Sequence, residues 1–269
     1  MFGGLGVSEL ETWLSGLSIP AAAALLLLEN VVIFVLALAA GAWTRRRFVH
    51  RPVSAPPGPL ERTEVFFVTT TVLLNTAVTL AGWALWRAGF IQIHEGTLAR
   101  AALDTVVLLV AMDLGMYVMH RVAHARLLFG PLHAPHHRYE NPRPLTLFVL
   151  TPLEAAGFGG MWLALLCVYP VSWLGMSVYL VLNVVFGVVG HLGVEPLPDA
   201  WARIPVLRDI GTSTFHARHH SLRDYNFGFY TLVWDRLFGT LDPSYAEGFG
   251  RPPEAPSPDA PRPDLHPVP

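Results

Sequence analysis

The chain has 269 residues, of which 52% are hydrophobic and only 14% are charged, and its mean hydropathy of +0.43 excludes an ordinary soluble domain and indicates an integral membrane protein. A net charge of -2, without a patch rich in basic residues, excludes a nucleic-acid binder. The single cysteine, Cys167, excludes a disulfide framework or a cysteine-based zinc site within one chain.

Four or five apolar runs are long enough to cross the membrane, since about 20 residues span about 30 Å of hydrocarbon. We therefore predict an all-α integral membrane protein with four to five transmembrane helices and a cytoplasmic, histidine-rich helical portion. A cleaved signal peptide would carry its positive charges before the first run, whereas here they follow it. The runs are residues 20–43, 65–86, 101–119, 145–169 and 172–190, the last two forming a hairpin turned at Pro170.

The arginines predict the orientation, because cytoplasmic loops carry the positive excess and the chain has no lysine. If the segment after the first run is cytoplasmic, that side collects every arginine except Arg87 and Arg100. This places the N-terminus outside and the C-terminus inside. In a bacterium the membrane would be the inner, or plasma, membrane.

Nine of the twelve histidines fall at four places in the chain, with the spacings His-x-x-x-His, His-x-x-His-His twice, and one single histidine. Helical residues four apart lie on one face, about 6 Å apart along the axis. The adjacent pair in a helical His-x-x-His-His diverges by about 100°, which suits ligands of two neighbouring metals. The nine are His120, His124, His133, His136, His137, His191, His216, His219 and His220.

These histidines predict two metal ions. All nine fall on the side that the arginines mark as cytoplasmic, although the arginine count did not use them. Nine nitrogen ligands exceed the four of a tetrahedral zinc, whereas two metals with four to six positions each absorb them. Iron, copper, nickel and zinc all suit imidazole ligands, so the spacing does not name the metal. His50, His94 and His266 lie outside the groups and are expected to be ordinary surface or hydrogen-bonded side chains.

Five stretches together resemble the fatty acid hydroxylase and sterol desaturase superfamily of membrane histidine-box di-iron oxygenases. They are residues 113–124 (DLGMYVMHRVAH), 132–139 (LHAPHHRY), 152–154 (PLE), 191–198 (HLGVEPLP) and, most specific, 214–240 (TFHARHHSLRDYNFGFYTLVWDRLFGT). The resemblance implies that cytosolic histidines bind two iron ions, which zinc can replace on purification. It implies an oxidoreductase that uses O₂ to hydroxylate or desaturate a lipid such as a sterol or fatty acyl chain. It carries the metal ligands over to all nine grouped histidines.

The resemblance also sets the predicted domains. Residues 61–242 form the membrane di-iron domain. Residues 1–60 add one transmembrane helix and a Pro-rich linker, and residues 243–269 form a Pro-rich tail that we expect to be disordered. No cytochrome b5 domain accompanies them in the sequence, so we expect electrons from another protein, a ferredoxin or a cytochrome b5-like protein with its reductase.

Polar residues near the histidines are candidates to hold the ligands in place. Metal-bound histidines usually donate their second N–H to a carboxylate or carbonyl oxygen. We expect Asp113, Glu154, Asp224 and Asn226 in this hydrogen-bonding role, and no catalytic residue beyond the metal ligands. A charge inside a span, as at Asp113, costs a few kcal/mol unless it is neutral, paired or hydrated. The sequence does not pair the other nearby carboxylates, Glu140, Glu195, Asp209 and Asp235, with particular histidines.

Two other classes of protein remain as alternatives. A metal transporter or sensor would place its ligands along the middle of the bilayer rather than at one end. A bis-histidine haem electron carrier would pair single histidines on facing spans. No residue distinguishes hydroxylation from desaturation or names the lipid.

Overall fold

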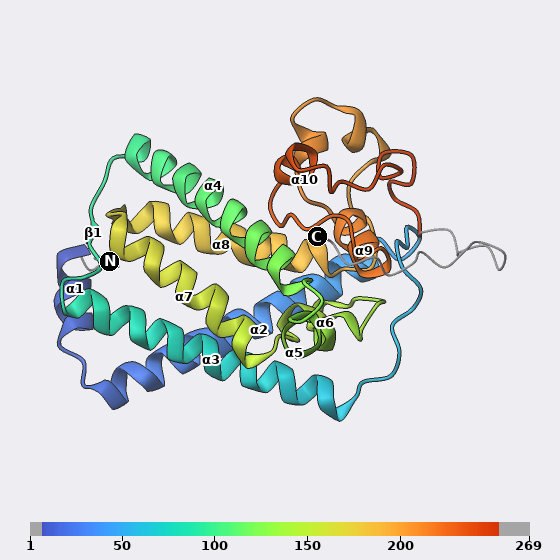
Figure 1. Cartoon of the computed structure of the whole chain (residues 1–269). Helices are drawn as coiled ribbons and strands as arrows, with labels where there is room; N and C mark the ends of the chain where they lie inside the picture. Colours follow the sequence, from blue (N-terminus) through green and yellow to red (C-terminus); the bar gives the residue numbers. More distant parts are fainter. Residues whose placement is uncertain (1–6, 253–269) are drawn as a thin grey trace.

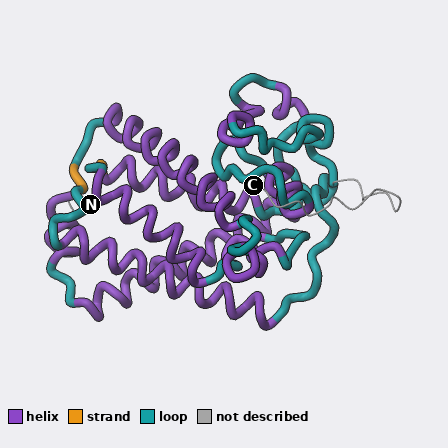
Figure 2. Tube along the Cα trace, viewed as in Figure 1, coloured by secondary structure: helices purple, strands orange, loops and turns teal. Residues whose placement is uncertain are grey.

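The computed structural model describes residues 7–252 (Figure 1), so our expectations for residues 1–6 and 253–269 lie outside the described part of the chain. Within that part the secondary structure is almost entirely helical (Figure 2). Long helices make up one end and the middle of the molecule, and short helices and loops gather at the other end.

Five helices form the body, and each runs in the direction opposite to the one before it (Figure 1). Helix α2 packs against α3 and α8, and α7 lies against α3 and α4, while α4 also packs along α8. The hydroxyls of Ser18, Thr97, Thr151 and Ser172 cap α2, α4, α7 and α8 by accepting a backbone N–H three residues on. The five are α2 (Ile19–Arg47), α3 (Arg62–Arg87), α4 (Leu98–Ala123), α7 (Pro152–Val168) and α8 (Trp173–Gly190).

Four of these helices, α2, α3, α4 and α8, are long and apolar enough to cross a membrane. The predicted all-α membrane architecture is therefore confirmed. The fourth predicted span, residues 145–169, begins too early, because Pro144–Phe148 form the 3₁₀ helix η1 and α7 starts only after its Thr151 cap. Its 17 residues reach about 26 Å, slightly less than the hydrocarbon thickness.

The end of the bundle away from the histidines holds elements that the sequence did not predict. Helix α1 (Val7–Ser15) lies there, where the Trp83 indole donates to the Leu14 carbonyl at 3.0 Å. Two short strands, β1 (Ile93–His94) and β2 (Val171–Ser172), pair in parallel. His94 therefore lies at the opposite end of the bundle from the grouped histidines.

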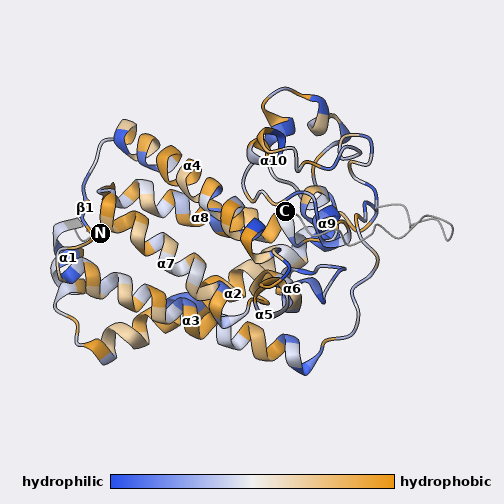
Figure 3. Ribbon diagram, viewed as in Figure 1, coloured by the Kyte–Doolittle hydropathy of each residue, from blue (hydrophilic) through white to orange (hydrophobic). Residues whose placement is uncertain are grey.

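Short helices form the other end, where hydrophilic residues are concentrated in α9 (Figure 3). Helix α9 is buried from Ser213 to His220, and its Phe215 packs in a cluster with Leu232, Tyr245 and Phe249. The packed structure thus continues past residue 242, where we predicted that the tail begins. The elements are α5 (Phe129–Leu132), α6 (Ala134–His137), η2 (Asp199–Arg203), η3 (Leu207–Asp209), α9 (Ser213–Ser221) and α10 (Val233–Leu237).

The predicted Pro-rich linker, residues 51–60, is held to the histidine end of the molecule by backbone hydrogen bonds at Arg51 and Val53. Val53 is fully buried, and its N–H donates to the Gly193 carbonyl at 3.1 Å. The Glu195 N–H donates to the Arg51 carbonyl at 2.9 Å. The first span and its linker are therefore packed into the same body as the rest of the described chain.

Candidate metal centre

The fold brings the nine grouped histidines together at one end of the bundle. His120 lies in the last turn of α4 and His124 caps that helix. His191 caps α8, so two spans end at the same place. Helix α6 contributes His136 and His137, and the residue before it, His133, completes the first His-x-x-His-His motif. Helix α9 contributes the second such motif, His216, His219 and His220.

The histidines form two groups that could each hold a metal ion. The four-histidine group is His136, His191, His216 and His220, and the five-histidine group is His120, His124, His133, His137 and His219. Within each group the potential ligand atoms all lie within 4.8 Å of one another. Adjacent histidines fall in different groups, His136 and His137 in one motif and His219 and His220 in the other, as the 100° divergence of neighbouring helical residues predicts.

The spacing of the Nε2 atoms fits ligands of a single ion in each group. In the five-histidine group, His120 and His133 have their Nε2 atoms 2.9 Å apart, and that of His137 lies 3.0 Å from that of His219. In the four-histidine group, the Nε2 atoms of His191 and His216 are 3.0 Å apart. Two nitrogens about 2.1 Å from one ion, at right angles, lie about 3.0 Å apart.

The second ring nitrogens point away from these centres, to backbone carbonyls. The Nδ1–H groups of His136, His191 and His219 donate to the carbonyls of Val149, Gly187 and Tyr225 at 3.1, 2.8 and 2.7 Å, and His120 donates to Phe227 at 2.9 Å. Such bonds place the ring proton on Nδ1 and leave Nε2 with a free lone pair.

Lone pairs therefore face one another inside both groups. The Nε2 atoms of His136 and His191, 3.4 Å apart, both lack a proton once Nδ1 carries it. Two such lone pairs repel unless a cation lies between them. The donor set and its orientation fit a metal ion in each group.

The environment keeps the imidazoles neutral, which is the form that binds metal. Burial lowers the pKa of His133 and of His191 to about 4. Burial, with the neighbouring imidazoles adding to it, lowers the pKa of His136, His216 and His220 well below the ordinary value. At neutral pH the centre therefore offers lone pairs rather than positive charge.

Of the residues predicted to hold the ligands, Glu154 touches one directly. Its Oε1 accepts from His133 Nδ1 at 2.6 Å, and both side chains are about 5% exposed. Asp113 lies in α4, about two turns before His120, and its carboxylate fixes the loop that leads into α10. Its Oδ1 accepts the N–H groups of Tyr230 and Thr231 at 2.8 and 3.2 Å, and its Oδ2 accepts the Trp234 indole N–H at 3.0 Å. That loop carries the Phe227 carbonyl that His120 contacts.

Asn226 and Asp224 do not contact the histidines. Asn226 is buried with a φ of 63°, a left-handed conformation that asparagine tolerates. Its side chain joins the Phe215 carbonyl of α9 to the Asp242 N–H. Asp224 is exposed, and within residues 7–252 no hydrogen bond or ion pair joins it to any of the nine histidines. Our expectation for Asp224 therefore has no support in the geometry.

Two carboxylates that we could not pair from sequence position the centre through the backbone. Glu195 accepts both the N–H and the hydroxyl of Thr214, at 2.9 and 2.6 Å, and so fixes the first turn of α9. Asp235 accepts the N–H groups of Phe227 and Gly228 at 2.8 and 2.7 Å. The carbonyl partners of the histidines gave no sequence signal, because every residue carries a carbonyl.

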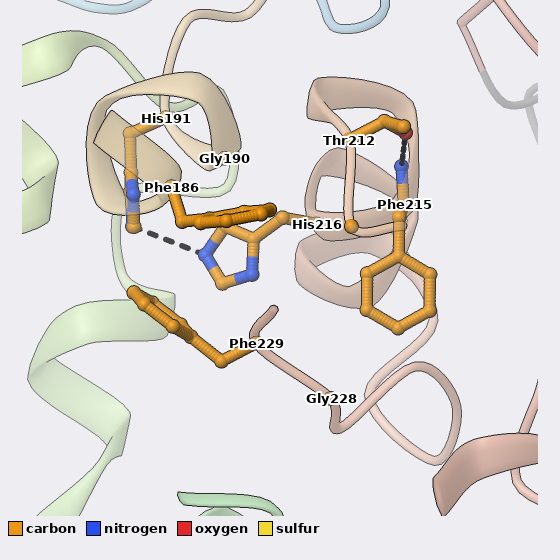
Figure 4. A pocket seen from close by; sticks show the side chains of 9 residues that line it. Phe186, Gly190, His191, Thr212, Phe215, His216, Gly228 and Phe229 are labelled. Carbon is orange, nitrogen blue, oxygen red and sulfur yellow. Dashed lines mark hydrogen bonds between the residues drawn. The ribbon is translucent and has the colours of Figure 1, made fainter. Parts of the chain in front are cut away.

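A small pocket lies beside the four-histidine group (Figure 4). His191, which caps α8, and His216 from α9 form part of its wall, together with Phe186 and Phe229. Apart from the histidines and Thr212, every lining residue is a glycine or a phenylalanine. The free space inside the pocket is about 10 Å³, which is room for about one water molecule.

Comparison with known proteins places this geometry in a family. The profile of the family described as "Fatty acid hydroxylase" matches residues 105–240, which are half of the chain. The match runs from the first half of α4 to just past α10 and includes all nine histidines. The chain belongs to the fatty acid hydroxylase family. The resemblance seen in the sequence is thereby confirmed, and the fatty acid hydroxylase match joins the apolar helices in identifying an integral membrane protein.

Individual relatives of this fatty acid hydroxylase family member act on different lipids, as their names state. Lathosterol oxidase of Homo sapiens is 28% identical over 199 residues, which are 70% of this chain and 64% of the human protein. Delta(7)-sterol 5(6)-desaturase of Leptosphaeria maculans is 27% identical over 139 residues, 52% of this chain and 37% of the relative. Very-long-chain aldehyde decarbonylase GL1-1 of Oryza sativa subsp. indica is 35% identical over 133 residues, 47% of this chain and 21% of the relative.

The chain thus spans less than two thirds of the length of each of these relatives. No solved structure matches it.

Proposed function

We propose that this chain is a membrane oxygenase that holds two iron ions, one in each histidine group, and oxidises a C–H bond of a lipid. The product is an alcohol or an alkene. The observation that carries the proposal is the set of Nε2 lone pairs that face one another at 2.9 to 3.4 Å in two adjacent groups. The names of the sterol and aldehyde relatives support a lipid as the substrate.

The residues of the chain would position the metals and exclude water from them. Bound iron supplies the ability to activate O₂ with electrons delivered from outside. The carbonyls of Val149 and Gly187 hold the rings of His136 and His191, and Glu154 holds His133. The burial of α9 keeps bulk water from His219 and His220.

We further propose that the histidine end faces the cytoplasm and that the N-terminus lies outside, which the arginine distribution supports. All three arginines at the end of α2 lie at the histidine end of the bundle. Electrons would come from a ferredoxin, or from a cytochrome b5-like protein with its reductase, on that side.

The alternative of a metal transporter receives less support, because all nine histidines lie at one end of the bundle rather than along its middle (Figure 1). A bis-histidine haem carrier would use single histidines on facing spans, whereas here α6 and α9 each supply ligands to both groups.

Metal analysis combined with an isotope experiment tests the proposal. The purified protein should contain about two metal ions per chain, iron or the zinc that displaced it. Iron-loaded protein supplied with a reductant, ¹⁸O₂ and membrane lipid should yield an oxidised lipid, labelled if the product is an alcohol. The His94→Ala variant, altered at the far end of the bundle, should match the parent. One metal per chain at full activity would contradict the two-metal proposal.

A further inference from the structure

Helix α10 turns apolar side chains outward and a carboxylate inward. Val233 and Leu237, one turn apart, are 46% and 67% exposed, and Phe238, which follows the helix, is 50% exposed. Asp235 between them is fully buried. A helix on the surface of a water-soluble domain shows the opposite pattern, with apolar residues inside and charges outside. We call the three exposed side chains, Val233, Leu237 and Phe238, the α10 face.

Asp235 fixes this orientation of the helix. Its carboxylate accepts the N–H groups of Phe227 and Gly228 at 2.8 and 2.7 Å, and the Thr240 hydroxyl at 2.7 Å. A rotation of α10 that turned Leu237 inward would break all three hydrogen bonds and leave buried N–H groups without acceptors, which is costly. The outward direction of the α10 face therefore follows from the packing of the segment.

Contacts with α4 fix the depth of the α10 face (Figure 1). The Phe238 ring stacks on that of Tyr117 with centroids 5.4 Å apart, and the Tyr117 hydroxyl lies 3.0 Å from that of Thr240. The 26 residues of α4 extend about 39 Å, about 9 Å more than the hydrocarbon thickness. Tyr117 lies six residues before the end of α4, which is also about 9 Å. Tyr117, and Phe238 beside it, therefore lie at the edge of the hydrocarbon or inside it.

The surface around Tyr117 is apolar as well. Leu114 and Val118, on either side of Tyr117 in α4, are 38% and 48% exposed. Since α4 is long and apolar enough to cross the membrane, these side chains face lipid. Arg236 is the charged residue on the outer side of α10, and it keeps 42% of its side chain exposed while pairing with Asp209. Basic residues beside apolar ones are typical of helices that lie in the headgroup region.

We propose that the α10 face lies in the leaflet at the histidine end of the bundle, with Val233, Leu237 and Phe238 against acyl chains and Arg236 at the headgroups. The partner is the bilayer that α4 crosses, because the stack on Tyr117 holds the α10 face at the depth of that bilayer. This inference goes beyond the proposed function, since it holds whether or not the histidine groups carry iron.

The same segment reaches the metal centre. Asp235 of α10 accepts the Phe227 N–H, and the Phe227 carbonyl accepts from His120 at 2.9 Å. Lipid that holds the α10 face in place would therefore also steady the loop that orients His120.

Spin labels measure the depth of the α10 face directly. The full chain is placed in vesicles of phosphatidylcholine and phosphatidylglycerol, Cys167 is replaced by serine, and Leu237→Cys supplies the labelling site. Power saturation then compares collisions with O₂, which concentrates in hydrocarbon, and with a polar nickel chelate, which stays in water. We expect the ratio of O₂ to nickel collisions to lie within about twofold of that at Val118→Cys in α4, and to exceed that at Glu140→Cys by about tenfold or more. Glu140 is the matched control because it is exposed and pairs with Arg223 at the histidine end.

A second labelling site covers the outcome in which Leu237→Cys does not fold. Val233→Cys lies on the same face and should give the same ratio. A ratio at these sites equal to that at Glu140→Cys would place the α10 face in water and overturn this inference. A label that neither reagent reaches would show that protein covers the face, for example a second copy of the chain, and would also overturn it. A protein that binds no iron would refute the proposed function and leave this inference intact.

Discussion

Removing the Glu154 carboxylate should loosen one metal and spare the other. Glu154 contacts His133 in the five-histidine group, and its Oε2 has no hydrogen-bond partner among the described residues. The Glu154→Ala variant would leave the His133 Nδ1–H buried and unbonded, which costs about 1–3 kcal/mol. Changes to the hydrogen-bonding partners of metal ligands typically cost about 10 to 100-fold in metal affinity, which corresponds to about 1.4–2.7 kcal/mol. The two estimates agree.

The assay is a chelator titration followed by metal analysis. In Glu154→Ala, one of the two metals should leave at a chelator concentration about 10 to 100-fold lower than in the parent, and the other should leave as before. Glu154→Gln keeps a carbonyl oxygen that can accept from His133, so its shift should be smaller than that of the alanine variant. Glu140→Ala is the control, because Glu140 is exposed and pairs with Arg223.

Two results would refute this reasoning. A parental titration curve for Glu154→Ala would mean that the hydrogen bond to His133 does not affect metal binding. Equal shifts for the alanine and glutamine variants would mean that the charge of Glu154, and not its acceptor oxygen, is what matters.

Two further predictions concern the histidines and the orientation. Alanine at His136 or at His219 should each lower activity by a large and similar factor, with loss of the metal in the altered group. The double variant should be little less active than either single variant, because activity needs both groups together. Full activity in either single variant would contradict the two-metal proposal. A reporter fused to the C-terminus should read as cytoplasmic and one fused to the N-terminus as external, and the reverse readings, or both ends on one side, would contradict the arginine-based orientation.

The spans and the gathering of the histidines could be predicted because both are local signals. Apolar runs mark helices whatever their partners, and a helix boundary shifts only where a cap or proline intervenes, as at Thr151 before α7. The arginine count and the histidine positions agreed on one end of the bundle, and the structure places all nine histidines there. The separation of His136 from His137 into two groups also followed from helix geometry.

Contacts that depend on tertiary structure could not be predicted. Glu154 meets His133 only because α7 starts beside α6, and nothing in the sequence chooses it over Asp224, which remains exposed. The same holds for Tyr245 and Phe249, which lie in a stretch that we assigned to a disordered tail but which pack against Phe215. Two aromatic residues in a Pro- and Gly-rich stretch are too weak a local signal to indicate a core.

The distribution of ligands along the chain has a consequence for biosynthesis. His220 follows His120 by 100 residues, so at about 5–20 residues per second the ribosome adds it roughly 5–20 s later. Both groups need residues of α9, which leaves the ribosome last of the ligand-bearing elements. During that interval α4 can already be in the bilayer, while His120 and His124 still lack their neighbour from α9, His219. Neither histidine group can therefore be complete before α9 has been synthesised, so any metal that the groups hold must bind late in the synthesis of the chain.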